Sequence, residues 1–355
     1  MKKISFILPG FSNRPIGGYK IAFEYANRLV KQGFKVNIVF LNNNAFSQKK
    51  IPKTIKKLLA YCFTKYEPKW FNLNKNIKKI SYYDFSYRKK LCSEVAVATS
   101  VETVEPVQKI FPFAKKVYLI QDFEDWNVSG DYVKATFQAG FENIVISRWL
   151  KNIVDKYSSK PSVYIQNPID NNIYHVYRPI NRRNKYVIGM LYHSAGYKGS
   201  KMTLKSLVKL KKTFPKLKIM MFGTCDRPKH IPDWITYQKN ATREETIKIY
   251  NSISIFVSGS IKEGFGLTGL EAMACGAALV TTNYDGAKEY AINNVNSLVV
   301  PVKDWEELSH KVEYLIKNDK KRVELARKGV ETSRDFSWDV AYRKFVNIIM
   351  NFSER

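Results

Sequence analysis

The chain has 355 residues, of which 45% are apolar, so it is long enough for about two domains of ordinary size. Its formal net charge of +28 favours an anionic partner, which is a nucleic acid, an anionic membrane surface or a phosphorylated ligand. The four cysteines are scattered, so their spacing indicates neither a disulfide framework nor a zinc site. No apolar run is long enough to span a membrane, and the apolar run at the start is too short for a signal peptide.

Short β-rich segments alternate with helical patterns from one end of the chain to the other. In the first half, strands are predicted over residues 4–9, 35–40, 95–100, 116–121 and 143–147. A helix is predicted over residues 19–33, where an apolar stripe recurs at helical spacing and Gly33 ends it. This alternation indicates an α/β architecture with a parallel sheet.

The second half repeats the same alternation. Strands are predicted over residues 186–192, 218–223, 253–260, 277–282 and 296–302, and helices over residues 201–214, 243–252 and 267–276. Residues 164–185, between the halves, are rich in Asn, Pro and Arg, so the junction is expected near residues 168–184. Open parallel sheets bind ligands beyond the ends of their strands, and a site between two such domains is the usual expectation.

Residues 262–276 combine two glutamates, Glu263 and Glu271, with a glycine-rich turn between a strand and a helix. Backbone N–H groups at a helix start attract phosphate, and Gly264 and Gly266 allow a ligand close to the main chain. Carboxylates accept hydrogen bonds from the paired hydroxyls of sugars. Either glutamate alone is more typical of favourable charge at a helix start. The combination favours a nucleotide sugar.

Residues 263–290 resemble the glutamate–seven–glutamate signature of retaining glycosyltransferases of family 4, which have the GT-B fold. The resemblance extends over nearly the whole chain, except residues 42–92. The further similar segments are residues 15–36, 146–154, 165–170, 197–207, 243–260 and 336–349. The resemblance implies two Rossmann-like domains facing across a cleft. The expected boundaries are an acceptor domain over 1–170, a donor domain over 171–335, and a C-terminal helix over 336–355 that crosses back.

The resemblance also implies site residues. Glu263 would hold the hydroxyls of the donor sugar, Lys198 would neutralise the diphosphate, and Glu271 would hold the ribose. The other donor-binding residues implied are Gly17, Gly18, Lys201, Gly264, Phe265, Gly266, Leu267 and Thr268. Taken alone, the Gly17–Gly18 pair is as typical of a plain turn. No metal ion or other cofactor is implied, because helix ends and lysines stabilise the diphosphate.

Two departures from the family pattern stand out. Met190 takes the position of a usual phosphate-binding arginine, for which Lys201 and His193 are the candidate replacements. Residues 118–126 lack the usual histidine near the sugar and offer Gln121, Asp122 and Glu124 instead. Asp122 is the predicted site residue there, and an ordinary exposed acidic loop is the alternative for Glu124 and Asp125. This variation resembles a subset that includes rhamnosyltransferases and favours a deoxysugar donor.

Residues 49–90 are strongly basic, and residues 51–63 predict an amphipathic helix with Ile55 and Leu58 on its apolar side. Basic flanks and aromatics beside an apolar face suit an anionic bilayer. The alternatives are a helix that packs on its own sheet and a segment that binds single-stranded nucleic acid. The bilayer is favoured over nucleic acid because no recognition module accompanies the segment.

We therefore expect a retaining glycosyltransferase of hexosyltransferase type. It would move a sugar from a UDP, GDP or dTDP donor to a glycan or lipid-linked acceptor in cell-surface polysaccharide synthesis. The expected location is cytoplasmic, peripheral at the inner face of the membrane. The alternatives are a nucleotide-sugar epimerase of the same fold and a non-catalytic protein that binds anionic membranes or nucleic acid.

Overall fold

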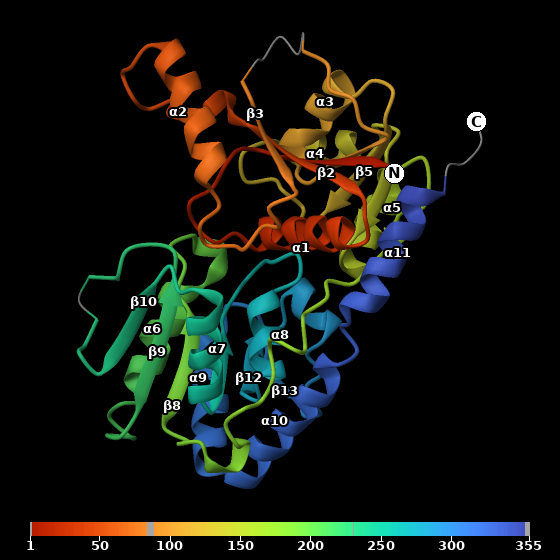
Figure 1. The fold of residues 1–355 in the computed structure, drawn as a ribbon. Coiled ribbons are helices and arrows are strands. Elements are labelled where there is room, and N and C mark those ends of the chain that lie inside the picture. The colour runs from red at the N-terminus through yellow and green to blue at the C-terminus, as the bar shows by residue number, and fades with distance from the viewer. Residues whose placement is uncertain (1, 84–88, 230, 352–355) are drawn as a thin grey trace. The chain divides into compact units, whose positions relative to one another are not determined.

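The computed structural model describes residues 2–83, 89–229 and 231–351. The chain divides into two compact units, and the C-terminal segment belongs with the first of them (Figure 1). Unit 1 comprises Met1–Gln166 and Asp339–Arg355, and unit 2 comprises Asn167–Trp338. The boundaries expected from the sequence were at residues 170 and 335.

Unit 1 is built on a parallel sheet of seven strands in the order β3-β2-β1-β4-β5-β6-β7. The strands are β1 (Lys3–Leu8), β2 (Lys35–Leu41), β3 (Lys78–Tyr82), β4 (Val95–Ala98), β5 (Lys115–Ile120), β6 (Glu142–Val145) and β7 (Val163–Tyr164). The strand order reverses between β1 and β4, which is the point where sheets of this kind bind ligands. All four residues of β4 are buried, as expected for a strand covered on both faces.

Helices flank this sheet in unit 1. They are α1 (Gly17–Lys31), α2 (Lys53–Tyr66), α3 (Val101–Ile110), α4 (Gly130–Phe137) and α5 (Arg148–Tyr157), with a short turn η1 (Asn42–Asn44) after β2. The last helix, α11 (Trp338–Met350), carries Phe345 into the core of unit 1. The Phe345 ring stacks on Tyr25 with 4.3 Å between ring centroids and on Phe6 with 6.0 Å. This aromatic packing explains why the end of the chain belongs with its beginning.

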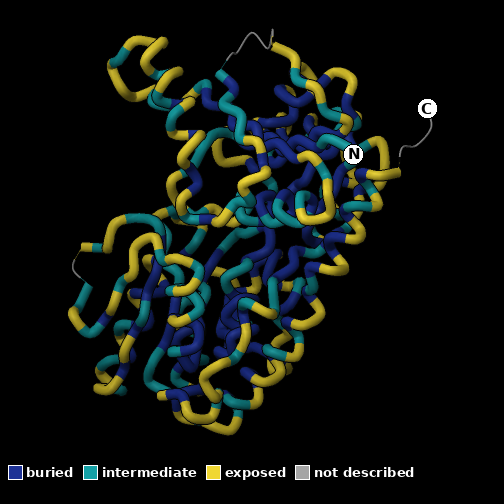
Figure 2. Tube along the Cα trace, viewed as in Figure 1, coloured by how far each residue is buried: buried dark blue, intermediate teal, exposed yellow. Residues whose placement is uncertain are grey.

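Unit 2 has a parallel sheet of six strands in the order β10-β9-β8-β11-β12-β13, so its order reverses between β8 and β11. The strands are β8 (Val187–Leu191), β9 (Lys218–Gly223), β10 (Ile235–Lys239), β11 (Ile255–Ser258), β12 (Ala278–Thr282) and β13 (Ser297–Val300). The helices are α6 (Ser200–Lys209), α7 (Arg243–Ser252), α8 (Leu267–Ala274), α9 (Trp305–Lys317) and α10 (Asp319–Ser333). Three single turns are η2 (Ile180–Arg182), η3 (Gly196–Lys198) and η4 (Asp285–Glu289). Apolar residues of β8, β11 and β12 form a buried core with α6 and α9 (Figure 2).

These two sheets confirm the predicted fold class, two Rossmann-like α/β domains. Strands β3, β7 and β10 were not predicted. All three are edge strands that pair with a single neighbouring strand. Strand β7 has only two residues, and β3 and β10 carry lysines, which natural proteins place on sheet edges.

The helix predicted over residues 51–63 is α2, but its apolar stripe does not pack on the sheet. Ile55 is 45% exposed and Leu58 is 62% exposed, whereas Ala60 and Thr64 are buried. The alternative of a helix packed on its own sheet is met in part, because α2 contacts β3 while these two apolar side chains remain largely exposed. Figure 1 shows α2 at the margin of unit 1, and its contacts with the sheet are to the edge strand β3.

Candidate functional site

The candidate site of unit 2 lies at the carboxyl ends of β8 and β11, two neighbouring parallel strands. The loop after β8 leads into η3 and α6, and the loop after β11 leads into α8. Two glycines let these loops approach: a Cβ on Gly199 would lie 1.9 Å from the backbone oxygen of Gly259. Gly199 also has a φ of +59°, which favours glycine. The reversal of strand order thus coincides with a close contact between the two loops.

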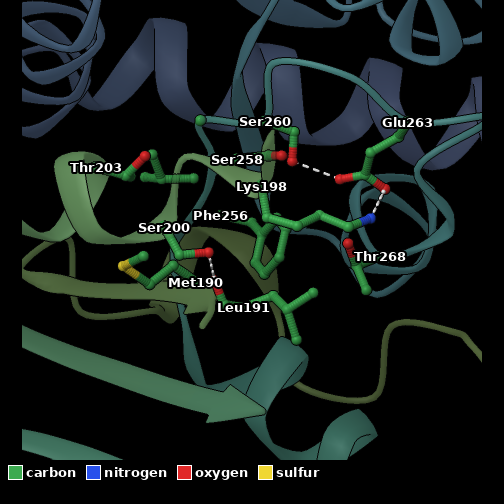
Figure 3. A pocket seen from close by; sticks show the side chains of 12 residues that line it. Met190, Leu191, Lys198, Ser200, Thr203, Phe256, Ser258, Ser260, Glu263 and Thr268 are labelled. Atoms are coloured by element: carbon green, nitrogen blue, oxygen red, sulfur yellow. Dashed lines mark hydrogen bonds and ion pairs between the residues drawn. The ribbon is translucent and has the colours of Figure 1, made fainter. Parts of the chain in front are cut away.

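Lys198 and Glu263 form the central ion pair of this site (Figure 3). The Lys198 ammonium lies 3.0 Å from Glu263 Oε2, and the two side chains are 20% and 12% exposed. The other carboxylate oxygen of Glu263, Oε1, accepts a hydrogen bond from the Ser260 hydroxyl. Because each carboxylate oxygen of Glu263 has its own partner, the plane of the carboxylate is fixed. The two predicted catalytic residues of unit 2, Lys198 and Glu263, thus lie in direct contact.

A small cavity of about 10 Å³ adjoins the ion pair. This is about the space that one water molecule requires. Lys198, Glu263 and Thr268 line it, together with the ends of both strands and the start of α6 (Figure 3). Its remaining lining residues are Met190, Leu191, Ser200, Thr203, Phe256, Val257, Ser258, Gly259 and Ser260. Three of the predicted site residues thus meet in one place.

The turn before α8 is held in shape by aromatic side chains. Gly266 has a φ of +85°, and a Cβ there would lie 2.1 Å from the Tyr284 hydroxyl. The Tyr290 hydroxyl donates to the Gly266 carbonyl at 2.7 Å and lies 3.0 Å from the Tyr284 hydroxyl. The Phe265 side chain is buried against Tyr290 and Phe336, so only its backbone is suited to a ligand. These contacts explain why the turn needs glycine at position 266.

The start of α8 presents backbone N–H groups at this edge of the sheet. At a helix start these groups have no carbonyl partner within the helix, so they attract anions. Leu267 and Thr268, both partly exposed, are the first two residues of α8, whereas Gly264 in the preceding turn is buried. The arrangement gives a positive electrostatic surface beside the Lys198 ammonium.

Glu271 lies one turn further along α8 and does not line the small cavity. It is only 5% exposed, and its Oε2 accepts a hydrogen bond from the Tyr250 hydroxyl of α7 at 3.1 Å. Burial, followed by the nearby Glu271 charge, raises the pKa of Tyr250 well above its ordinary value. The contact of Glu271 with a ribose stays a prediction.

The predicted replacements for the missing arginine differ in charge. Met190 is 1% exposed and packs in the core of unit 2. His193 Nδ1 accepts the Ala195 backbone N–H at 3.0 Å. Burial, and then the Lys198 ammonium, hold the pKa of His193 below its ordinary value, so this side chain is neutral at pH 7. Lys201, exposed in the first turn of α6, is the candidate that carries a charge.

In unit 1, Gly17 and Gly18 are the first residues of α1, which follows β1. The Gln121 side-chain amide donates to the Gly18 carbonyl at 3.2 Å, and a Cβ on Gly18 would lie 3.0 Å from that amide nitrogen. Asp122 directly follows Gln121 beyond the end of β5, and its Oδ1 accepts the Phe123 backbone N–H at 2.8 Å. The structure therefore places Gly17, Gly18 and Asp122 at the carboxyl edge of the sheet in unit 1.

The alternative of an exposed acidic loop is wrong for Glu124, whereas Asp125 is exposed as that alternative expects. The Glu124 side chain is 9% exposed and accepts the Val101 backbone N–H, at the start of α3, at 2.6 Å. Burial raises the pKa of Glu124 to about 8, and the neighbouring Asp122 also favours the protonated form. The sequence offers no signal for this, because acids in loops are usually exposed.

Ser260, Gly199 and Gly259 were not predicted as part of the site. Ser260 directly follows Gly259, the first residue after β11, and only its contact with Glu263 reveals its role. The glycines in the loops that follow β8 and β11 were the available signal for a close approach of these loops. Among the described residues, no group of three or more His, Cys, Asp or Glu side chains is placed to hold a metal ion.

Comparison with known proteins finds a family model that matches most of unit 2. Residues 177–332 match the family model of glycosyl transferases group 1. The "N,N'-diacetylbacillosaminyl-diphospho-undecaprenol alpha-1,3-N-acetylgalactosaminyltransferase" of Campylobacter jejuni is 28% identical over 106 residues, which are 30% of this chain. The "Capsular polysaccharide biosynthesis glycosyltransferase CapM" of Staphylococcus aureus is 25% identical over 154 residues, 41% of this chain. The matches span 28% and 40% of the lengths of these relatives.

Solved structures resemble the whole chain. Sucrose-phosphate synthase from Thermosynechococcus elongatus superposes with a TM-score of 0.75 at 14% identity, covering 98% of each chain. HepE from Anabaena, solved in complex with UDP and glucose, gives a TM-score of 0.73 at 14% identity, covering 98% of this chain and 99% of that one. The predicted resemblance to glycosyltransferases and the GT-B fold is confirmed. Assignment to family 4 stays a prediction.

Proposed function

We propose that this chain, whose residues 177–332 match the family model of glycosyl transferases group 1, is a retaining glycosyltransferase. It would transfer a sugar from a nucleotide-diphosphate donor to a glycan or lipid-linked acceptor in cell-surface polysaccharide synthesis. The observation that carries the proposal is the Lys198–Glu263 pair beside the start of α8. The names of the relatives from Campylobacter jejuni and Staphylococcus aureus support the acceptor class.

In this proposal, Lys198 and the N–H groups at the start of α8 bind the diphosphate. Negative charge on the diphosphate grows as the sugar leaves, so these groups stabilise the transition state more than the bound donor. Glu263 accepts hydrogen bonds from the donor sugar. Its orientation is already fixed by Ser260, which reduces the reorganisation needed when the donor binds.

The proposed reaction exchanges one bond for another on the same face of the sugar. The bond between the anomeric carbon and the diphosphate oxygen breaks, and a bond from that carbon to the acceptor oxygen forms. The acceptor proton passes to the departing phosphate oxygen, so the products are the glycosylated acceptor and a nucleoside diphosphate. Glu271 is proposed to bind the ribose, and Gly17, Gly18, Asp122 and Lys201 are proposed to assist donor binding.

No resident metal ion is assigned a role in this proposal, since Lys198 and the helix start supply the positive charge. Transfer should therefore persist when the enzyme is dialysed against EDTA and assayed in EDTA. Loss of transfer on chelation, with recovery on adding Mg²⁺ or Mn²⁺, would contradict this part of the proposal.

The donor and the stereochemistry can be tested together. The donor should raise the melting temperature of the chain, since a ligand that binds only the native state stabilises it. We would screen UDP, GDP and dTDP sugars by thermal shift and follow the transferred sugar by NMR. An unchanged anomeric configuration is expected. Inversion would refute the retaining mechanism, and conversion of the donor into an epimer without transfer would favour the epimerase.

We also propose that residues 49–90 attach the chain to an anionic membrane surface. The support is the exposed apolar surface of α2, which includes Ile55, Leu58 and Tyr66, among lysines. Among the described residues, no helix is both long and apolar enough to cross a bilayer. Flotation with anionic vesicles should fall for the Ile55→Gln/Leu58→Gln variant. A matched change of exposed Phe113 to Gln should have no effect, and equal flotation of all three proteins would refute the attachment.

A further inference from the structure

A cavity of about 450 Å³ lies in unit 1, between the first turns of α2 and the end of the edge strand β3. Its described lining residues are Lys53, Thr54, Lys57, Ile80, Ser81, Tyr82, Tyr83, Lys89 and Leu91. The cavity opens at the carboxyl end of β3. Ligands of parallel sheets bind beyond the carboxyl ends of strands, and this cavity lies beyond the carboxyl end of the outermost strand of the sheet.

The charged side chains that line the described part of this cavity are all basic. Three of the described lining residues are lysines, Lys53, Lys57 and Lys89, and none of them is acidic. All three lysines are exposed, so their ammonium groups are accessible from solvent. Three like charges around one space repel each other, and an anion between them relieves that repulsion. The cavity is therefore suited to a ligand with more than one negative charge.

Polar groups at the base of the cavity are held in place by hydrogen bonds. Tyr82 is 2% exposed, and its hydroxyl donates to the Lys89 carbonyl at 2.9 Å, which ties the Lys89 segment to β3. Ser81 Oγ accepts the Asn42 side-chain amide at 2.7 Å. Its own hydroxyl hydrogen can then be donated to a phosphate oxygen. The lysines are thus placed around a base that is partly preorganised.

The same helix connects this cavity to exposed apolar surface. Successive helix residues are rotated by about 100°, which places Ile55, Leu58, Cys62 and Tyr66 on one stripe. Tyr61, 60% exposed, lies at an angle between Lys57 and Leu58, so it joins the lysine side of α2 to the stripe. A ligand that has a phosphate group at one end and a hydrocarbon chain at the other matches both features.

We propose that this cavity binds the diphosphate of an isoprenoid-linked acceptor, whose hydrocarbon chain lies along the exposed stripe of α2. The proposal rests on the proposed function, since it names the class of acceptor. Lys53, Lys57 and Lys89 bind the diphosphate through charge-assisted hydrogen bonds, which are about twice as strong as neutral ones. The volume of the cavity exceeds that of a diphosphate, which leaves room for the first sugar.

The test is calorimetric titration of the full chain with farnesyl diphosphate, which carries the same head group on a short chain. The cavity variant changes three lining lysines to glutamine: Lys53→Gln, Lys57→Gln and Lys89→Gln. The matched control removes the same charge from exposed lysines of the same segment that do not line the cavity: Lys50→Gln, Lys65→Gln and Lys75→Gln. Because every site is exposed, both variants are expected to fold.

The cavity variant should bind farnesyl diphosphate about tenfold more weakly or worse, and the control should lose less than about twofold. Farnesol and inorganic pyrophosphate should each bind the wild type more weakly than farnesyl diphosphate. Equal weakening by both variants, or no binding to the wild type, would overturn the site. Pyrophosphate binding as tight as that of farnesyl diphosphate would show a free-phosphate site, and displacement by phosphatidylglycerol vesicles would show a headgroup site. Either result overturns the lipid-linked acceptor.

Failure here is distinguishable from failure of the proposed function, because the Lys198–Glu263 pair lies in the other unit and no proposed donor-binding residue lines this cavity. Hydrolysis of the donor sugar with water as acceptor should be the same in the wild type, the cavity variant and the control. Normal hydrolysis without farnesyl diphosphate binding would reject the cavity alone. Absence of hydrolysis in the wild type, with farnesyl diphosphate bound, would reject the transferase and leave the cavity as a lipid-phosphate site.

Discussion

Replacement of Glu124 by glutamine should stabilise the chain above pH 5 and flatten the pH dependence of its stability. The pKa of this carboxyl is about 8 in the folded chain, against an ordinary value of 4.5, because burial disfavours the charged form. The folded state therefore binds the proton more tightly than the unfolded state. This contribution to stability is complete below pH 4.5 and is lost as the pH rises to 8.

The size of the effect follows from the gap between the two pKa values. Each pKa unit corresponds to roughly 1.4 kcal/mol of unfolding free energy. Ionisation of Glu124 therefore lowers the unfolding free energy of the wild type by at most about 5 kcal/mol at pH 9 and about 3 kcal/mol at pH 7. Relaxation of the site around the charge would reduce both figures. Glutamine keeps an oxygen that accepts the Val101 N–H, 2.6 Å from Glu124 Oε2 in the structure, so the start of α3 stays capped.

The assay is urea unfolding of both proteins at pH 5, 7 and 9, followed by circular dichroism. Titration of every other group occurs in both proteins, so the difference between them isolates Glu124. The free energy of unfolding of the variant should exceed that of the wild type by little at pH 5 and by progressively more at pH 7 and 9. Parallel pH profiles, or a variant that is less stable at pH 9, would refute the assignment of a buried and protonated carboxyl.

Three further changes test the donor site. Lys198→Ala should reduce turnover by about 100-fold or more and also weaken donor affinity, because the diphosphate gains charge in the transition state. Steady-state kinetics tests this: weaker donor affinity with normal turnover would make Lys198 a simple binding residue. Gly266→Ala should destabilise unit 2 by about 2 kcal/mol or more, because the residue has a positive φ and no room beside Tyr284; an unchanged melting temperature would contradict this. Tyr250→Phe should destabilise by about 1–3 kcal/mol, since the buried Glu271 carboxylate loses a donor, and urea unfolding that matches the wild type would show that this hydrogen bond contributes nothing.

The central strands were predictable because burial on both faces gives them continuous apolar runs. Strand β4, whose four residues are all buried, is an example. The edge strand β3 was not predictable in this way, since Lys78 and Lys79 interrupt its apolar pattern. The Lys79 ammonium donates to the backbone carbonyls of Lys65 and Glu67, which only the folded structure brings near.

The chemistry of the site was predictable from a short motif, but its geometry was not. Glu263 and the glycine turn lie within a few residues of each other, and Lys198 was placed by resemblance. The ion pair between Lys198 and Glu263 joins positions that are far apart in the sequence, and it depends on the approach of Gly199 to Gly259. Contacts of this kind arise from the strand order, which fixes the neighbours of β8.

The central claim is that Glu263 acts on the sugar of a nucleotide donor. The most direct measurement is the release of nucleoside diphosphate from UDP, GDP and dTDP sugars, with a membrane lipid extract as the source of acceptor, by wild type and Glu263→Gln. The claim predicts that one donor is consumed at least about 100-fold faster by the wild type, while both proteins bind the nucleoside diphosphate equally. Equal rates of consumption by the two proteins, with the variant correctly folded, would contradict it.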